Sequence, residues 1–177
     1  MKQVALDFGL LLVILKMMDR TKTKQLLAYL IQEHSSASVT VLIKLSYLID
    51  LVSVKKEHNQ VTDFEYRRYY FGPFDNSIYS LLSELETEGV IVGGVKYTSG
   101  GEEYVVYSIN GEKEDVSFDR LTEKDYEVAD QVLEQVRGYG AKVLTEVAYQ
   151  TAPMKKLGAT LGGNENLNEK LDLTCNG

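Results

Sequence analysis

The pair Gly72-Pro73 is the sharpest break in the sequence, and it separates two kinds of hydrophobic spacing. Before it, residues 64–71 alternate with a period of two and are rich in aromatic side chains, which favours a short strand. After it, the apolar residues between positions 74 and 85 give one face of a helix. Glycine tolerates a positive φ, and proline lacks the amide hydrogen that a first helical turn leaves unused. We therefore predict that this helix starts at Pro73 and ends at Gly89.

Two amphipathic helices are predicted upstream of that strand. Residues 21–32 and 38–52 carry leucines and isoleucines at the three- and four-residue spacing of a buried helical face, and Ser38 suits the N-cap of the second helix. Downstream, residues 90–98 and 103–109 are rich in β-formers and flank a Ser-Gly-Gly turn, which predicts a hairpin. The order helix, helix, strand, helix, hairpin is that of a winged helix.

A C-terminal helical pair is predicted after an acidic linker at residues 111–120. Its first helix starts at the capping-box-like sequence from Thr122 to Asp125, and its second runs from 141 to 151 and is ended by Pro153. The predicted fold class is mainly α with a small β-hairpin, a winged-helix-like core followed by this helical pair. The chain is predicted to divide into three parts: an apolar N-terminal extension at residues 1–20, a single domain at 21–156, and a flexible Gly/Asn-rich tail at 157–177.

The apolar run from Val4 to Leu15 bears on localisation. It is shorter than the roughly 20 residues that span a bilayer, so no membrane contact is expected. Asp7 interrupts the run and no small-residue cleavage site follows it, which disfavours a signal peptide. The run is either a helix that docks on the domain or the result of a translation start placed upstream of Met17 or Met18. Both interpretations predict a cytoplasmic protein.

Residue types that support catalysis or metal binding are scarce. Cys175 is the only cysteine, so one chain forms neither a disulfide framework nor a cysteine-rich zinc site. His34 and His58 are the only histidines and do not have a metal-ligand spacing. No serine lies in a G-x-S-x-G element, and neither Gly-Gly pair precedes the Lys-Ser/Thr of a phosphate-binding loop. We expect no enzymatic activity, no metal and no cofactor.

The charge is divided unevenly along the chain. The net charge is 19 − 26 = −7, with ten Lys/Arg against seven Asp/Glu in residues 1–72, and nine against nineteen in residues 73–177. The helix predicted after Gly72 would be the one to enter the DNA major groove in a winged helix. From Pro73 to Glu88 it has no Lys or Arg, which a phosphate-binding surface requires. DNA binding by the isolated protein is therefore not expected.

Three segments together resemble one known family. They are Lys44-Leu-Ser-Tyr47-Leu-Ile-Asp50, then Gly72-Pro73-Phe74 followed by Ile78-Tyr79, and Leu121-Thr122 leading through Val132-Leu133 to Leu144-Thr-Glu-Val147. Their order and spacing resemble the Panacea/SocA-like antitoxin domain, found in bacterial, archaeal and phage toxin–antitoxin modules, over roughly residues 24–156. Tyr149 and Met154 stand where the family usually has histidine and tryptophan.

The resemblance implies a protein-binding antitoxin that neutralises a cognate protein toxin by occluding it. The alternative function is a winged-helix transcription regulator that binds DNA, and a homodimer is one option for the oligomeric state. We predict a partner surface made of these residues: Lys44, Tyr47, Asp50, Tyr69, Tyr70, Gly72, Pro73, Tyr79, Glu84 and Glu88. Other interpretations stay open: the Lys44 side chain extends along its helix to solvent, Asp50 caps or faces solvent, and Tyr79 belongs to the core.

Overall fold

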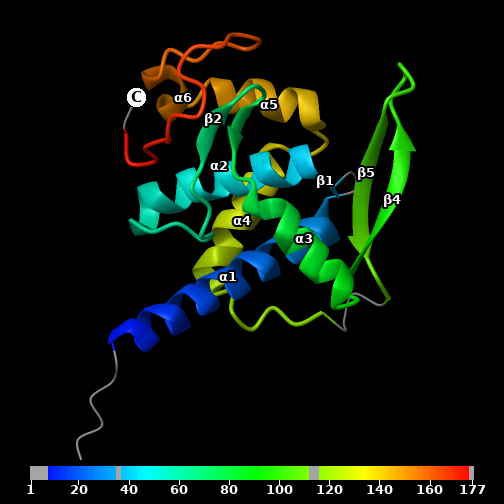
Figure 1. The fold of residues 1–177 in the computed structure, drawn as a ribbon, viewed down its shortest axis with the longest axis vertical. Coiled ribbons are helices and arrows are strands. Elements are labelled where there is room, and N and C mark those ends of the chain that lie inside the picture. Colours follow the sequence, from blue (N-terminus) through cyan, green and yellow to red (C-terminus); the bar gives the residue numbers. More distant parts are fainter. Residues whose placement is uncertain (1–7, 35–36, 112–115, 176–177) are drawn as a thin grey trace, which may run out of the picture.

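The computed structural model describes residues 8–34, 37–111 and 116–175 of the 177-residue chain. Within them the fold is mixed α/β, with six helices and two small antiparallel sheets (Figure 1). The helices are α1 (Phe8–Glu33), α2 (Val39–Glu57), α3 (Ser77–Thr87), α4 (Glu123–Gln135), α5 (Ala141–Tyr149) and α6 (Ala152–Lys156). The strands are β1 (Ala37–Ser38), β2 (Arg67–Tyr69), β3 (Gly72–Phe74), β4 (Ile91–Tyr97) and β5 (Glu103–Ile109).

Helix α2 crosses the middle of the molecule, and α1, α3, α4 and α5 pack around it (Figure 1). Its side chains from Val41 to Leu51 are all buried, including the charged ones. Ser38 has an extended backbone and its hydroxyl accepts a hydrogen bond from the N–H of Val41, so the predicted N-cap is confirmed. The central position of α2 lets its side chains reach loops on several sides of the domain.

The predicted hairpin is confirmed as β4 and β5, which pair antiparallel. The short strand β1 adds to the other edge of β5, so the sheet order is β1-β5-β4 and β4 is an edge strand. This hairpin stands to one side of the helices with its turn pointing away from the body (Figure 1). Helices combined with a small hairpin agree with the prediction, although β2 and β3 form a second sheet. The winged-helix geometry stays a prediction.

The predicted helix start at Pro73 is wrong. Pro73 lies in β3, which pairs with β2 across a two-residue turn, and α3 begins only at Ser77. The predicted strand at 64–71 is reduced to β2 by the same turn, and Gly72, directly after it at the start of β3, has the positive φ (+91°) that favours glycine. Asn76 is the N-cap residue of α3, and the Asp75 carboxylate before it stabilises the first turn by accepting hydrogen bonds from the N–H (2.8 Å) and hydroxyl (2.7 Å) of Ser77.

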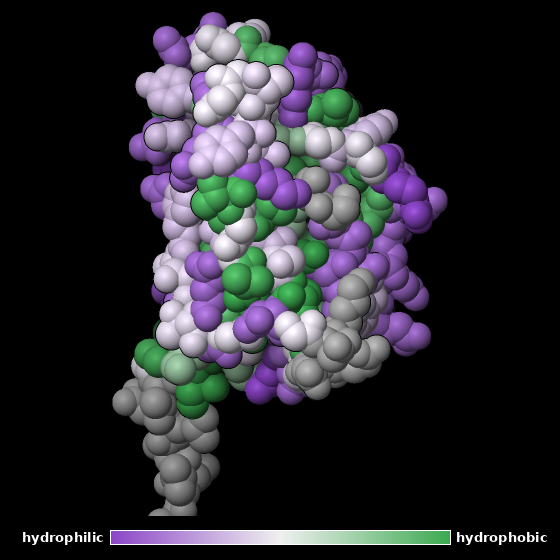
Figure 2. Space-filling view, turned by 90° about the vertical axis from the view of Figure 1, so that its right-hand side faces the viewer, coloured by the Kyte–Doolittle hydropathy of each residue, from purple (hydrophilic) through white to green (hydrophobic). Residues whose placement is uncertain are grey.

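Helix α1 is continuous through the boundary predicted at residue 20. Its second half carries Leu26, Leu27 and Leu30 into the core, whereas its first half projects from the body (Figure 1). Six large apolar side chains on the projecting half are exposed: Leu12, Val13, Ile14, Leu15, Met17 and Met18. Figure 2 shows hydrophobic atoms gathered next to the grey N-terminal residues, at this end of α1. Within the run from Val4 to Leu15, docking on the domain is therefore wrong for the four exposed residues Leu12 to Leu15, and positions 4–7 of the run lie outside the described residues.

The C-terminal segment beyond residue 157, expected to be a flexible tail, packs against β2 in the structure. The N–H of Asn168 donates to the carbonyl of Arg68 (2.7 Å), and the N–H of Leu171 donates to the carbonyl of Tyr66 (2.9 Å). Leu171 and Leu173 are buried. A Gly/Asn-rich composition conceals this packing, because the pairing uses backbone groups and only two leucines enter the core. None of the described helices is long and apolar enough to cross a membrane.

Candidate functional site

Aromatic side chains cover the β2–β3 turn and the start of α3. This aromatic surface consists of Tyr69, Tyr70, Phe71, Phe74 and Tyr79. Four of the rings form a row, with centroids 5.3 Å apart for Tyr69–Tyr70, 5.6 Å for Tyr69–Phe74 and 5.9 Å for Phe74–Tyr79. Phe71, at the turn, is 70% exposed, and Tyr79 is 56% exposed. Exposed neighbouring rings of this kind offer a large contact area for little loss of side-chain entropy, which is typical of protein interfaces.

A hollow of about 240 Å³ opens beside the aromatic surface. Tyr69 and Phe74 form its apolar wall, and Glu65 and Arg67 bring charges of opposite sign to it. Asn168 of the C-terminal segment also lines it. A space of this size suits one inserted side chain rather than a cofactor, which needs several hundred cubic ångströms.

Buried cationic side chains hold the hairpin that carries the aromatic surface. Lys44, on α2, is 1% exposed and its ammonium donates to the carbonyl of Pro73 (2.8 Å). The hydroxyl of Tyr149, on α5, donates to the carbonyl of Tyr70 (3.0 Å), and the guanidinium of Arg68 lies 5.4 Å from the Tyr149 ring centroid. Burial lowers the pKa of Lys44 to about 7. The β2–β3 hairpin is therefore attached to α2 through the carbonyl of Pro73 and to α5 through the carbonyl of Tyr70.

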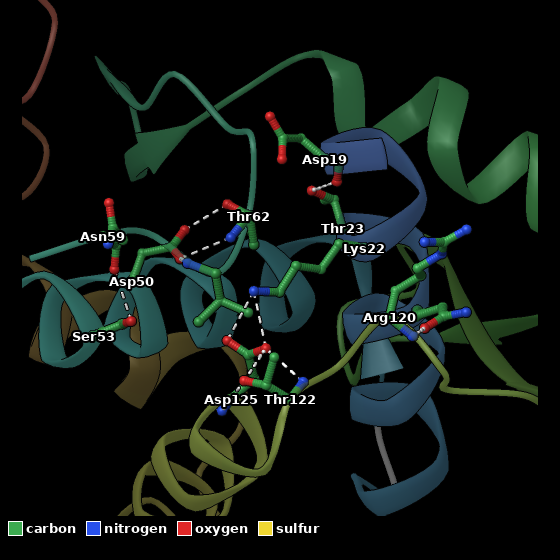
Figure 3. Close-up of polar contacts among 12 residues, drawn as sticks. Asp19, Lys22, Thr23, Asp50, Ser53, Asn59, Thr62, Arg120, Thr122 and Asp125 are labelled. Carbon is green, nitrogen blue, oxygen red and sulfur yellow. Dashed lines mark hydrogen bonds and ion pairs between the residues drawn. The ribbon is translucent and has the colours of Figure 1, made fainter. Parts of the chain in front are cut away.

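Asp50 holds the loop that leads into the hairpin (Figure 3). Its carboxylate is buried and accepts hydrogen bonds from the N–H groups of Val61 (2.7 Å) and Thr62 (3.0 Å). The hydroxyls of Thr62 and Tyr66 (2.7 Å) donate to its other oxygen. Burial raises the pKa of Asp50, and these hydrogen bonds to the charged form partly offset that effect. Figure 3 also shows Lys22 paired with Asp125 (2.9 Å), which joins α1 to α4.

The structure divides the predicted partner residues into two groups. Lys44, Tyr47, Asp50, Gly72 and Pro73 are buried, so their side chains present no surface to a partner. The interpretations in which Lys44 reaches solvent and Asp50 caps or faces solvent are also wrong, because α2 is enclosed by other elements. Their contacts with loop and hairpin backbone make them supports of the site rather than parts of it.

The three predicted tyrosines that are exposed lie together. Tyr69 and Tyr70 are 48% and 50% exposed and belong to the aromatic surface with Tyr79. The interpretation of Tyr79 as a core residue is wrong, since the neighbouring Ile78 fills the core position instead. Phe74 was absent from the predicted set although its ring joins Tyr69 to Tyr79. The pairing of β2 with β3, which the sequence did not predict, is what brings these rings together.

The acidic side of α3 is paired within the molecule. Glu84 forms ion pairs with Arg20 and with Lys24 (3.6 Å), and Glu88 forms one with Lys24. The hydrogen bond from Arg20 is the main reason that the pKa of Glu84 is lowered. The basic residues at the middle of α1 therefore compensate the acidic helix. A free acidic patch that steers a basic partner is not present at these two glutamates.

Among the residues that the structure describes, no group of three or more His, Cys, Asp or Glu side chains is placed to hold a metal ion. No curated protein and no solved structure matches the chain significantly. The sequence does match the family described as "Antitoxin SocA-like, Panacea domain" over residues 42–153. This match runs from α2 to α6 and contains the β2–β3 hairpin and the aromatic surface. It also contains Lys44, Asp50 and Tyr149, which hold the hairpin and its entry loop. The chain therefore belongs to the SocA-like antitoxin, Panacea domain family.

Proposed function

We propose that this protein is a non-catalytic antitoxin that neutralises a cognate protein toxin by binding it through the aromatic surface. The observation that carries the proposal is the row of exposed rings on a hairpin that is fixed from beneath by Lys44 and Tyr149. A pre-organised aromatic patch loses little entropy on docking and supplies the kind of side chains that dominate interface energies. Membership of an antitoxin family supports a toxin as the partner.

The alternative, a DNA-binding regulator, finds little support in the charges. Helix α3 has no Lys or Arg from Ser77 to Thr87, and base or phosphate contacts need such side chains. The basic residues nearest to it, Arg20 and Lys24, are already paired with Glu84 and Glu88. We expect the isolated protein to bind DNA no more tightly than roughly 10⁻⁵ M at physiological salt.

Rescue of growth tests this proposal. The chain is co-expressed with the product of its neighbouring reading frame, provided that this product is toxic alone, and toxin binding is measured by calorimetry on the purified pair. Tyr69→Ala and Tyr79→Ala are expected to weaken binding at least about tenfold each, as truncated interface tyrosines do. Tyr139→Ala is the matched control, because Tyr139 is also exposed but lies between α4 and α5, away from the hairpin.

The melting temperature separates a binding defect from a folding defect. Both surface tyrosines are about half exposed, so their variants should melt close to the native protein. Reversal of Glu84 or Glu88 is a poor test, since it would place positive charges beside Arg20 and Lys24. Full rescue by a folded Tyr69→Ala/Tyr79→Ala double variant would show that the toxin binds elsewhere. A nanomolar complex with operator DNA would favour the regulator instead.

A further inference from the structure

Strand β4 has a free edge on the outer side of the hairpin. The backbone N–H of Thr98 donates to the carbonyl of Glu102 (2.8 Å), and the N–H of Asn110 donates to the carbonyl of Val90 (2.9 Å). Because hydrogen-bonded pairs alternate along an antiparallel ladder, the even-numbered residues of β4 are the ones bonded to β5. The N–H and C=O groups of the odd-numbered residues therefore point away from β5. Among the strands that the structure describes, none pairs with Val95 or Tyr97 on that side, because β4 is last in the sheet order.

This edge carries exposed apolar side chains. Val95 is 55% exposed and Tyr97 65%, and Val105, directly opposite Val95 on β5, is 37% exposed. A two-stranded ribbon is marginally stable alone, and an apolar edge of this kind is a template for pairing with another strand. Figure 2 looks at the side of the molecule on which β4 and β5 lie, and hydrophobic patches interrupt the polar surface there.

The sequence of β4, Ile-Val-Gly-Gly-Val-Lys-Tyr, is complementary to itself in one antiparallel register. When Val95 faces Val95 of another copy, Tyr97 lies opposite Gly93 and Lys96 lies opposite Gly94. Gly94 leaves a gap that the opposing Lys96 can cover. The side chains of Glu86, Val105 and Tyr107 line the space over Gly93, so Glu86 must move before Tyr97 of the second copy fits over this glycine, as aromatic residues do over edge glycines. Moving the two-fold axis by one residue, to Lys96, would instead place Lys96 opposite Lys96 of the second copy, and like charges directly opposite are destabilising.

We propose that β4 is a self-association edge, which pairs with β4 of a second copy about a two-fold axis through Val95. The two hairpins then form one continuous antiparallel sheet, and the surface used is the same on both copies, as a two-fold dimer requires. The rings on β2 and β3 lie on the other sheet and stay free in this dimer, whereas Tyr79, on α3, lines a hollow together with Val105 and Tyr107 of β5. The features that favour the dimer belong to β4 and its neighbours, so it does not depend on the identity or existence of a toxin.

In the single chain, the side chain of Glu86 occupies part of this edge. Its carboxylate accepts a hydrogen bond from the outward N–H of Gly93 (3.0 Å), one of the groups that the dimer would use. A Cβ on Gly93 would lie 2.9 Å from the same carboxylate oxygen, so glycine is what lets Glu86 approach. Pairing must release Glu86 from Gly93, which makes the dimer less stable and allows a substitution at Glu86 to test it.

Sedimentation velocity on the full chain, up to about 100 µM, tests the proposal. We expect a dimer that Val95→Lys and Val95→Glu each abolish, because the substituted charges would face themselves across the axis. An equimolar mixture of the two variants should dimerise again, since Lys then faces Glu. Glu86→Ala should strengthen the dimer several-fold. Leu12→Gln/Leu15→Gln is the matched control for association through the exposed half of α1 and should remain dimeric.

Each other outcome overturns the proposal. A native chain that is monomeric throughout has no self-association edge, and loss of toxin binding in Val95→Lys would then assign the edge to the toxin. A dimer that survives both Val95 variants, or that is lost in the Leu12/Leu15 control, is formed by another surface. Variants that stay monomeric when mixed exclude the register centred on Val95. Circular dichroism confirms that each variant is folded.

Discussion

Removal of the Asp50 carboxylate should loosen the loop beneath the aromatic hairpin at a measurable cost. In Asp50→Ala the N–H groups of Val61 and Thr62 lose their acceptor, whereas the hydroxyls of Thr62 and Tyr66 can rotate toward each other. A buried donor left without a partner costs about 1–3 kcal/mol. Two such donors cost about 4 kcal/mol, offset slightly because a buried charge is also removed. For a chain of this length that lowers the melting temperature by roughly 8–16 °C.

Asp50→Asn is the matched comparison, because it keeps the shape and one oxygen. The amide oxygen can still accept from Val61 and Thr62, and the amide NH₂ can donate to the hydroxyls of Thr62 and Tyr66 if these rotate. We expect this variant to lose only about 1–2 kcal/mol. The order of the two variants therefore reports hydrogen-bond satisfaction rather than side-chain volume.

Urea unfolding followed by circular dichroism and tyrosine fluorescence measures both variants, and the absence of tryptophan leaves tyrosine as the intrinsic probe. Burial raises the pKa of Asp50 above its unfolded value. Its titration therefore favours folding most below the unfolded pKa, and this contribution is lost as the pH rises through the folded pKa. Asp50→Asn should remove that dependence. The reasoning is refuted if Asp50→Ala unfolds within about 1 kcal/mol of the native protein, or if it is more stable than Asp50→Asn.

Three further predictions concern other parts of the molecule. Burial lowers the pKa of Lys44 to about 7, so its contribution to stability is present above the unfolded pKa near 10.4 and is lost as the pH falls toward 7. When the pH is lowered from 9.5 to 6.5, the unfolding free energy of Lys44→Met should therefore rise relative to that of the native chain. An equal difference between the two proteins at both pH values contradicts this. Leu171→Ala should cost about 2–3 kcal/mol in urea unfolding because Leu171 is buried, whereas an unpacked tail would give no change. Leu12→Gln should leave the unfolding free energy within about 0.5 kcal/mol and Leu26→Ala should lower it by about 3 kcal/mol, and similar effects at the two positions would refute the projecting half-helix.

Local signals predicted the parts of the fold that depend on neighbouring residues. The Ser38 cap and the hairpin around Ser-Gly-Gly are confirmed, and so is the capping box of Thr122 and Asp125. Each involves residues that are close in sequence, so its chemistry can be recognised from a short segment. At these positions the local sequence determines whether the backbone forms a helix, a strand or a turn.

The errors occur where a distant segment decides the outcome. Pro73 is favourable at a helix start, yet pairing of β3 with β2 and the bond from Lys44, 29 positions earlier, place it in a strand. The sequence predicts Asp50 to be exposed or capping, and this is wrong because its hydrogen-bond partners lie 11 to 16 positions further on. A polar side chain on an apolar helix is exposed or satisfied in the interior, and periodicity does not distinguish these cases.

The aromatic surface combines residues inside and outside the segments that carry the family resemblance: Phe74 and Tyr79 lie inside them, and Tyr69, Tyr70 and Phe71 lie outside. Lys44, Asp50 and Pro73 belong to the motif segments, are buried, and fix the backbone of the hairpin and its entry loop. The turn residues Tyr70 and Phe71 lie outside those segments and point into solvent. Side chains at the turn can change without disturbing the buried bonds, because those bonds run to backbone carbonyl and N–H groups. Substitution of Tyr70 or Phe71 is therefore expected to alter the exposed surface of the hairpin while the bonds from Lys44 and Tyr149 to its backbone are kept.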